Sequence, residues 1–306
     1  MKHIFIINPT AGVKNSTEEI KEELLNLKLS DYEVYETKAH GDATLFVKEY
    51  IATHKGEAVR FYACGGDGTL FEVINGAVGA SNVEVSCIPI GSGNDFLKYF
   101  GSANDFRNID NLVNGYPVDI DLLKLNNSYI TNVFNVGFDS RVVVKQAKIK
   151  KWPLMTGKSA YNLSVFFSLF GKLSWKCKLR IDDELVYDGK MTLSAIANAK
   201  CYGGGYYCCP KAKVDDGLLD ICFVKKVSVI TFAMLVKKYK AGLHVDDPKI
   251  MKHLIYRQGK KVQLELDKVL PYSADGEIEY SNNIIIEIVS KAIKFVLPKT
   301  IDYKQN

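Results

Sequence analysis

Three glycine-rich turns carry polar side chains that could bind phosphate. They are Asn8–Gly12 (NPTAG), Gly65–Thr69 (GGDGT) and Gly91–Asp95 (GSGND), and each follows a short apolar run. Glycine lets the backbone approach a ligand closely, and consecutive N–H groups near the start of a helix attract anions. One such turn could be an ordinary tight turn. Three of them, each with an Asn, Asp, Ser or Thr, indicate phosphate binding.

The first third of the chain predicts alternating strands and helices, which would place the three turns together. In a doubly wound, mostly parallel sheet the strands end at one edge, where such folds bind ligands. Ser16 with Glu19 forms a capping-box pattern, and Asp42 is the expected N-cap of the second helix. The expected strands are His3–Ile7, Glu33–Glu36, Ala58–Ala63 and Val83–Ile90, and the expected helices follow Ser16 and cover Ala43–His54 and Leu70–Asn75.

From about Pro117 the pattern changes to strands separated by turn signals. The sequence therefore predicts an α/β domain over residues 1–120 and an antiparallel β-sandwich domain over 121–297, with an active-site cleft between them. The tail, 298–306, is expected to pack back on the first domain. The expected strands are Val118–Leu125, Tyr129–Val136, Lys176–Ile181, Met191–Ala199, Leu218–Val224, Val262–Leu266 and Ile284–Leu297, and the helices Val142–Lys150, Ala160–Leu169 and Val229–Ala241.

Composition excludes several classes of protein. The chain has 306 residues, of which 47% are hydrophobic and 25% charged, as in ordinary globular proteins. We expect a cytoplasmic protein, since no apolar run approaches the roughly 20 residues that cross a bilayer and the first residues lack signal-peptide features. A net charge of +5 is too small to favour a nucleic-acid partner. The seven cysteines form no CxxC pair, so we expect reduced thiols and no zinc site.

Two common nucleotide motifs do not fit. Thr156–Ser159 (TGKS) is similar to the end of a P-loop, but the first glycine of that motif would fall at Trp152. No GxGxxG follows the first expected strand. A P-loop ATPase and a Rossmann dehydrogenase are therefore both excluded.

A longer set of motifs resembles the bacterial diacylglycerol kinase-like lipid kinase family. GGDGT alone is shared with NAD kinases, whereas the C-terminal DGLLD and DGE segments are more specific. The set follows the family's order over nearly the whole chain, and the resemblance implies an ATP-binding first domain, a lipid-binding β-sandwich and catalysis between them. Besides the three turns, it comprises Asn135–Asp139 (NVGFD), Gly203–Gly205 (GGG), Pro210 with Ala212, Asp216–Asp220 (DGLLD) and Asp275–Glu277 (DGE).

The resemblance also assigns the nucleotide site. The family usually has Thr at Ser92 and Asn at Phe71; Ser keeps the hydroxyl, whereas Phe cannot hydrogen-bond, which leaves nucleotide positioning and substrate preference open there. Asp67 is expected to hold the catalytic Mg²⁺ on the phosphates, with a plain Asx-turn as the alternative. The residues expected to contact ATP are Asn8, Pro9, Thr10, Ala11, Gly12, Thr37, Gly65, Gly66, Asp67, Gly68, Thr69 and Ser92.

Two acidic segments in the second half carry the other expected roles. By resemblance, Asp275 or Glu277 is the general base for the lipid hydroxyl, with Glu277 the position usually named; without the family, a turn acid in a β-hairpin would be the default. The Asp216 carboxylate and the carbonyls of Lys213 and Leu218 would hold a second, structural Mg²⁺. An Asp-Gly β-turn is the alternative there.

The lipid side rests on a basic and aromatic stretch. Lys145, Lys148, Lys150 and Lys151 precede Trp152, and Tyr161–Phe170 is rich in aromatic residues. This composition suits anionic headgroups and the membrane interface. A solvated helix face followed by a buried helix would explain it as well.

Taken together, the sequence predicts an ATP-dependent lipid kinase in peripheral contact with a membrane. Diacylglycerol is the leading acceptor, and phosphatidylglycerol, a sphingoid lipid and a homodimeric state stay open. One alternative is an NAD kinase-like enzyme, against which DGLLD and DGE weigh. Another is a non-catalytic lipid-binding protein, against which the retained Asp67, Asp216, Asp275 and Glu277 weigh.

Overall fold

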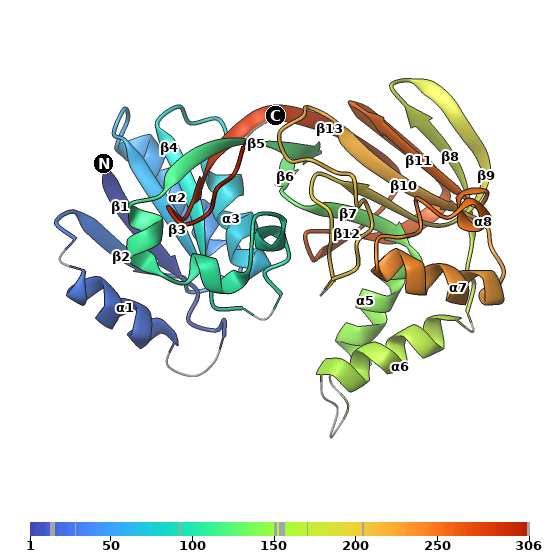
Figure 1. Ribbon diagram of the computed structural model, residues 1–306, viewed down its shortest axis with the longest axis horizontal. Helices are drawn as coiled ribbons and strands as arrows, with labels where there is room; N and C mark the ends of the chain where they lie inside the picture. Colours follow the sequence, from blue (N-terminus) through green and yellow to red (C-terminus); the bar gives the residue numbers. More distant parts are fainter. Residues whose placement is uncertain are drawn as a thin grey trace. The chain divides into compact units, whose positions relative to one another are not determined.

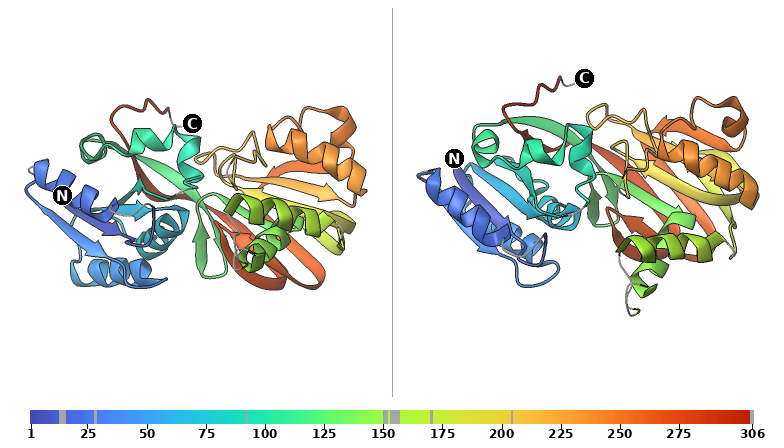
Figure 2. Two further views of the ribbon diagram at one scale, coloured as in Figure 1. Left: turned by 90° about the horizontal axis from the view of Figure 1, so that it is seen from below. Right: turned by 60° about the horizontal axis from the view of Figure 1, so that its bottom comes forward.

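The computed structural model describes residues 1–12, 16–27, 29–91, 93–149, 152, 157–169, 171–203 and 205–304, with side chains in the α6 segment from 163 onward. It divides into two compact units (Figures 1 and 2). We call Met1–Leu122, Val214–Gly217 and Val289–Asn306 the N-terminal unit. We call Leu123–Lys213 and Leu218–Ile288 the β-rich unit.

The N-terminal unit is built on a parallel sheet. Strands β1 (Lys2–Ile7), β2 (Tyr32–Glu36), β3 (Val59–Gly65) and β4 (Val83–Pro89) pair in the order β4–β3–β1–β2, and the end of β13 (Glu277–Leu297) adds to β4. Every residue of β3 is buried, as expected for a central strand covered on both faces. The predicted doubly wound, parallel sheet is therefore confirmed.

Helices cover both faces of this sheet. Figure 2 (left) shows α1 (Ser16–Asn26) on one face and α2 (Asp42–Thr53) on the other, where α3 (Asp67–Ala77) packs beside α2. This is the arrangement that right-handed crossovers give when the chain first steps outward to β2 and then returns past β1. The short helices η1, η2 and α4 cover Phe96–Tyr99, Ala103–Phe106 and Ile109–Val113.

The start of α2 differs from the sequence prediction. The N-cap is Gly41, in the left-handed region, and Asp42 is the first helical residue. The orphan N–H groups of Gly41 and Ala43 donate to the Glu72 carboxylate of α3, at 2.8 and 3.2 Å. The Asp42 carboxylate instead accepts from Lys38 N at 2.7 Å. A cap supplied by a residue distant in sequence replaces the local one, which a local pattern cannot reveal.

The β-rich unit is antiparallel, as predicted. Its strands pair in the order β11–β10–β9–β7–β12–β13, and β8 pairs with both β9 and β12. Strand β5 (Tyr116–Leu125) begins in the N-terminal unit and ends in this one. The other bounds are β6 (Ser128–Ile130), β7 (Val133–Gly137), β8 (Trp175–Ile181), β9 (Glu184–Ala197), β10 (Leu219–Lys225), β11 (Leu254–Gly259) and β12 (Lys261–Ala274).

Alternating residues of these strands fill two cores. Ile221 and Phe223 of β10 point into one core and Cys222 and Val224 into the other. Helix residues Phe138 and Phe232 close the second core, with their rings 4.5 Å apart. The helices are α5 (Phe138–Ile149), α6 (Gly157–Leu169), α7 (Val229–Lys240) and α8 (Pro248–Met251), and Figure 1 shows α5, α6 and α7 beside the strands.

Three details of the β-rich unit correct the sequence prediction. The expected strand Tyr129–Val136 is two strands, β6 and β7, separated at Thr131 and Asn132. Strand β11 was not predicted, and β9 and β12, each 14 residues long, extend beyond the strands predicted there.

All seven cysteines are buried and unpaired. Among the helices that the structure describes, none is long and apolar enough to cross a membrane.

Candidate active site

The glycine-rich turns meet at the carboxyl edge of the parallel sheet. Ile90 N and Gly91 N both donate to Gly65 O, at 3.0 and 3.1 Å, and Asn8 N donates to Cys64 O at 3.0 Å. Thr37 lies at the same edge, where its N–H donates to Ile7 O at 2.9 Å. The structure thus brings together the predicted segments Asn8–Gly12, Thr37 and Gly65–Thr69. Ser92 lies outside the described residues.

Side chains of these turns also contact one another. Asn8 Nδ2 donates to Thr69 Oγ1 at 3.3 Å, and Asn8 Oδ1 accepts from Thr10 N and Thr10 Oγ1 at 3.0 and 2.8 Å. Thr69 is buried in the first turn of α3, and Phe71 follows in the same helix. The Asn8 amide therefore fixes the first turn against the start of α3.

Most of the glycines are required by close packing of the turns. A Cβ on Gly91 would lie 2.6 Å from Gly66 Cα, and one on Gly65 would lie 2.1 Å from Thr69 Oγ1. Gly12 has φ +81°, and its Cβ would lie 2.6 Å from Ile90 O. Gly66 is the exception, because its Cβ would come no closer than 3.5 Å to Gly91 Cα. The first three glycines serve the fold, whereas Gly66 leaves room at the start of α3.

Asp67 ties the second and third turns together. Its Oδ1 accepts from Asp95 N at 2.7 Å, and its Oδ2 lies 2.6 Å from where a Cβ of Gly93 would be. Asp67 is also the first residue of α3, where the helix dipole favours a negative charge or a bound anion. The two turns therefore share one electropositive helix start.

The donor set at Asp67 is compatible with Mg²⁺. Within the described ranges no group of three or more His, Cys, Asp or Glu side chains could hold a metal ion. Mg²⁺ usually keeps several waters and binds one or two protein carboxylates together with phosphate oxygens. Asp67 beside the phosphate-binding turns meets that requirement, and the other ligands would come from the nucleotide and water.

Asp275 is already saturated by protein donors. It has φ 48° and Gly276 has φ 100°, which is the geometry of a two-residue hairpin turn between β12 and β13. Its carboxylate accepts from Thr131 N, Thr131 Oγ1, Asn132 N and Val133 N, at 2.7, 2.6, 3.1 and 2.9 Å. Burial raises the pKa of Asp275, and these donors act in the opposite direction. The arrangement fits a structural turn acid better than a general base.

Glu277 has a different environment. It is the first residue of β13, opposite Ala274 of β12, and its side chain is half-buried. Of the predicted pair it is therefore the better candidate for accepting a proton.

The segment at Thr131 and Asn132, which donates to Asp275, has further hydrogen bonds. Asn198 Nδ2 donates to Thr131 O at 3.0 Å, and Asn132 Nδ2 donates to Cys201 O at 3.0 Å.

Asp121 is a residue of the N-terminal unit that sequence reasoning missed. Its carboxylate accepts from Gly217 N at 2.6 Å and from Lys291 N at 2.7 Å, while its own N–H donates to Val214 O at 2.6 Å. Burial raises the pKa of Asp121, and the two N–H donors oppose that rise. The sequence feature that could have identified Asp121 is an acidic residue within the apolar strand sequence VDIDLL.

Asp121 thereby fixes the segment that contains Asp216. Gly217 has φ +71°, which agrees with the Asp-Gly turn. This backbone geometry does not test the predicted Mg²⁺ site. Of the predicted ligand set, Asp216 lies in Val214–Gly217 of the N-terminal unit, while Lys213 and Leu218 belong to the β-rich unit. Carboxylate and carbonyl oxygens are suitable donors for this hard cation.

The predicted lipid-facing stretch lies on α5 and α6. Lys145 and Lys148 are on α5, and Lys150 and Lys151 lie outside the described residues. Trp152, Phe166 and Phe167 are 51%, 53% and 44% exposed. Val165 and Leu169 of α6 pack against the second core, so this helix has one buried and one exposed face.

Comparisons with known proteins agree with these features. A model of the diacylglycerol kinase catalytic domain matches residues 2–125, and a model of the YegS C-terminal NAD kinase beta sandwich-like domain matches residues 132–297. A Shewanella frigidimarina protein described as a probable lipid kinase, YegS-like, is 28% identical over 94% of this chain and 92% of its own length. A Staphylococcus aureus diacylglycerol kinase is 29% identical over 89% of this chain and 84% of its own.

Solved structures show the same fold. A diacylglycerol kinase from Bacillus anthracis superposes with a TM-score of 0.73 at 21% identity, covering 98% of each chain. An NAD kinase from Archaeoglobus fulgidus superposes with a TM-score of 0.50 at 12% identity, covering 97% of this chain and 94% of its own. With both domain models matched in order along the chain, this protein belongs to the diacylglycerol kinase-like lipid kinase family and is an enzyme of that kind.

Proposed function

We propose that the protein transfers the γ-phosphoryl group of ATP to the hydroxyl of diacylglycerol and so forms phosphatidic acid. The observation that carries the proposal is the meeting of three glycine-rich turns at the start of α3, where Asp67 joins the second and third turns and Asn8 joins the first to Thr69. Relatives named diacylglycerol kinase over most of the chain support this acceptor.

The residues divide the work of phosphoryl transfer. Backbone N–H groups at Gly66–Gly68 and the hydroxyls of Thr10 and Thr69 are the groups we assign to the ATP phosphates. Mg²⁺, when bound at Asp67, would offset the negative charge of the phosphates. We assign Glu277 as the base that accepts the proton of the lipid hydroxyl as its oxygen bonds to the γ-phosphorus, while the bond from that phosphorus to the bridging oxygen breaks and ADP leaves. Asp275 then acts as a positioning residue, because it fixes the hairpin from which Glu277 extends.

We also propose peripheral contact with a membrane, because the acceptor is a lipid. The exposed Trp152, Phe166 and Phe167 in the β-rich unit are suited to the interface. Lys148, at the end of α5, would add attraction to an anionic leaflet.

A panel of acceptors tests the activity. The protein is incubated with radiolabelled ATP and Mg²⁺ in mixed detergent micelles that contain diacylglycerol, phosphatidylglycerol or a sphingoid base, and separately with NAD. We expect label in phosphatidic acid, at a rate at least about a hundredfold lower with Glu277→Gln. Label in NADP would favour the NAD kinase alternative. No label with any acceptor would favour a non-catalytic lipid-binding protein.

A further inference from the structure

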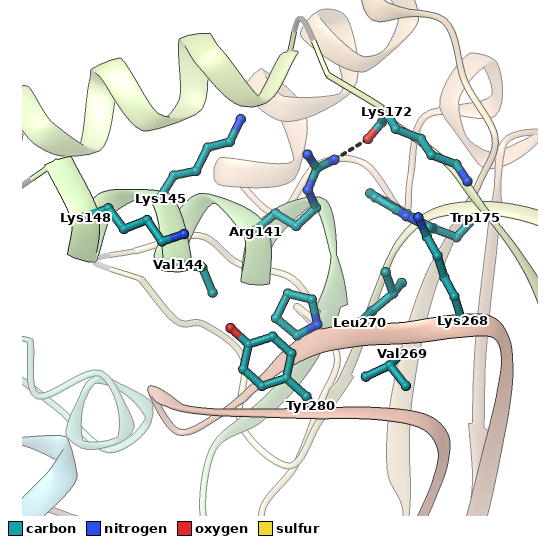
Figure 3. A pocket seen from close by; sticks show the side chains of 11 residues that line it. Arg141, Val144, Lys145, Lys148, Lys172, Trp175, Lys268, Val269, Leu270 and Tyr280 are labelled. Carbon is teal, nitrogen blue, oxygen red and sulfur yellow. Dashed lines mark hydrogen bonds between the residues drawn. The ribbon is translucent and has the colours of Figure 1, made fainter.

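A groove of about 380 Å³ lies within the β-rich unit, and strands β12 and β13, whose hairpin also carries Glu277, contribute residues to its lining. Figure 3 shows α5 along one side and the β12–β13 strands along the other. Its volume falls within the range of pockets that hold a small ligand or a headgroup. The groove is a different place from the ATP turns, because it shares no residue with them.

The lining of this groove is strongly basic. Five cationic side chains contribute to it, and no Asp or Glu does: Arg141, Lys145, Lys148, Lys172 and Lys268. No hydrogen bond or ion pair to a described residue is found for the side chains of Lys148, Lys172 and Lys268. Like charges held together without acidic partners are costly, so this lining is arranged to receive an anion.

The other two cations are fixed in place. Arg141 Nη1 donates to Lys172 O, and its guanidinium lies 5.3 Å from the centre of the Trp175 ring. Lys145 Nζ donates to Phe167 O at 2.8 Å. Burial lowers the pKa of both side chains, and the nearby Arg141 lowers that of Lys145 further. A bound anion would stabilise the charged forms of Arg141 and Lys145, which burial disfavours.

An irregularity in β12 builds the opposite rim. Glu265 pairs with Asn283 of β13 but Leu270 pairs with Ser281, so four residues of β12 stand opposite one. Such a bulge changes the direction in which side chains point, and here it places Lys268 and Val269 in the lining of the groove. Val269 and Tyr280 are 58% and 62% exposed, which gives the basic groove an apolar rim open to solvent.

We propose that this groove binds the phosphate of an anionic phospholipid headgroup, as an accessory site distinct from the ATP turns. Cations with no acidic partners select the phosphate, and the exposed rim at Val269 and Tyr280 fits the glycerol and first acyl carbons of a lipid in a bilayer. A soluble phosphate would gain nothing from that rim. The site places the enzyme on anionic membrane, whichever hydroxyl it phosphorylates.

Vesicle binding without ATP tests this assignment independently of catalysis. The full-length protein is sedimented with vesicles of phosphatidylcholine alone or of an equimolar mixture with phosphatidylserine, which has no free hydroxyl to accept phosphate. We expect Lys148→Gln/Lys268→Gln to weaken partitioning onto the anionic vesicles about 30-fold, since each lysine near the surface contributes about 1 kcal/mol. The matched control, Lys249→Gln/Lys252→Gln, removes the same charge from the α8 region, whose lysines do not line the groove. We expect it to change partitioning by less than about threefold.

Three results would overturn the proposal. Equal losses in the two double variants would mean attraction to a diffuse basic surface. Partitioning that is unchanged in the groove variant would mean that the groove contacts no lipid. Calorimetric titration with inorganic phosphate is the remaining arm. If phosphate alone binds the wild type and not the groove variant, while both partition equally onto vesicles, the groove is a site for soluble phosphate.

Discussion

Glu277 and Asp275 are two residues apart, yet we assign their carboxylates different roles, Glu277 as the general base and Asp275 as a positioning residue. Glu277→Gln keeps the shape of the side chain and removes its ability to accept a proton. Loss of a general base typically costs about 10²–10⁴-fold, so we expect kcat to fall at least about a hundredfold with ATP affinity little changed. Steady-state kinetics in mixed micelles measure this. Glu287→Gln, an exposed carboxylate farther along β13, is the control and should keep kcat.

Asp275→Asn should behave differently, because four donors depend on the carboxylate. An amide offers one acceptor oxygen and two unwanted donors, so we expect the free energy of unfolding to fall by about 1–3 kcal/mol. Denaturant titration measures this loss. If Asp275→Asn instead keeps full stability and loses more kcat than Glu277→Gln, Asp275 is the base.

Asp139 gives the β-rich unit a pH dependence of stability. Its carboxyl group accepts a hydrogen bond from Tyr202, and burial raises its pKa from 3.8 to about 6. The native state therefore binds this proton more tightly than the unfolded state. The stabilisation is fully present below about pH 4 and is lost as the pH rises through about 6.

Asp139→Asn should remove that dependence, since an amide stays neutral and its oxygen still accepts from Tyr202. A pKa rise of this size corresponds to at most about 3 kcal/mol, so we expect the variant to be up to that much more stable at pH 7. The difference should vanish below pH 4. Urea unfolding of both proteins at several pH values provides the measurement, and a difference independent of pH would contradict the assignment.

Sequence predicts residue roles well where a motif is local. The turns at Asn8, Gly65 and Gly91 could be recognised because strand, glycines and polar residue are contiguous. The role of Asp275 depends on Thr131, more than a hundred residues away, and that of Asp121 on Gly217 and Lys291. Such partners are set by strand register, which a single sequence does not reveal.

At the level of elements, the start of α3 separates folding from nucleotide binding. A Cβ on Gly91 would lie 2.6 Å from Gly66 Cα, whereas one on Gly66 has ordinary contacts and a permitted φ of −106°. We expect Gly91→Ala to lower the free energy of unfolding by about 1–3 kcal/mol through overpacking. Gly66→Val should keep the fold and weaken ATP binding, because its branched side chain stands beside the N–H groups of the turn.

Thermal unfolding and calorimetric ATP titration of both variants separate these effects. Gly66→Ala is the milder companion variant and should fall between Gly66→Val and the wild type in ATP affinity. If Gly66→Val binds ATP normally, the turn is only structural and the nucleotide assignment fails.

The segment Val214–Gly217 offers a second test at this scale. If Asp216 anchors a structural Mg²⁺, the ion should raise the melting temperature of the wild type, since a ligand of the native state stabilises it. We expect Asp216→Ala to lower both melting temperature and activity, without rescue by excess Mg²⁺. Asp121→Asn is the control for the turn itself. It should lower stability while leaving a response to Mg²⁺, and a variant at Asp216 with unchanged stability and activity would leave only the Asp-Gly turn.

The order of elements was largely predictable, and the errors have physical causes. Apolar runs with helical or alternating spacing found the strands of the parallel sheet and α2, α3 and α7 within a few residues. The pattern underestimated β9 and β12, because only part of each strand is fully buried. It missed β11, whose exposed Arg257 and Gln258 interrupt the alternation.

At the scale of the whole molecule, the binding functions fall in different units. The proposed ATP turns belong to the N-terminal unit, whereas Glu277 and the basic groove belong to the β-rich unit. Binding of nucleotide and binding of anionic membrane should therefore be separable by mutation, while catalysis requires both. The net charge of +5 is modest, so attraction to an anionic surface depends on where the lysines gather rather than on their number.

This separation predicts how three variants behave with two forms of substrate. With a short-chain diacylglycerol dispersed in neutral detergent, Lys148→Gln/Lys268→Gln should keep the wild-type kcat and the ATP affinity, because the proposed accessory site binds neither ATP nor the acceptor. With long-chain diacylglycerol in anionic vesicles, the same variant should show a lower rate at equal bulk lipid, recovered when vesicles are in large excess. Gly66→Val should lose activity in both assays and still sediment with anionic vesicles. Glu277→Gln should bind both ATP and vesicles, with kcat at least about a hundredfold lower. Raising the salt concentration should lower the activity on vesicles more in the wild type than in the groove variant. Salt screens the electrostatic attraction to the membrane, which the variant already lacks.

Initial rates and sedimentation, measured in parallel for each variant, test these expectations. A groove variant that loses kcat equally in neutral detergent would place the groove in the acceptor site itself and contradict its accessory role.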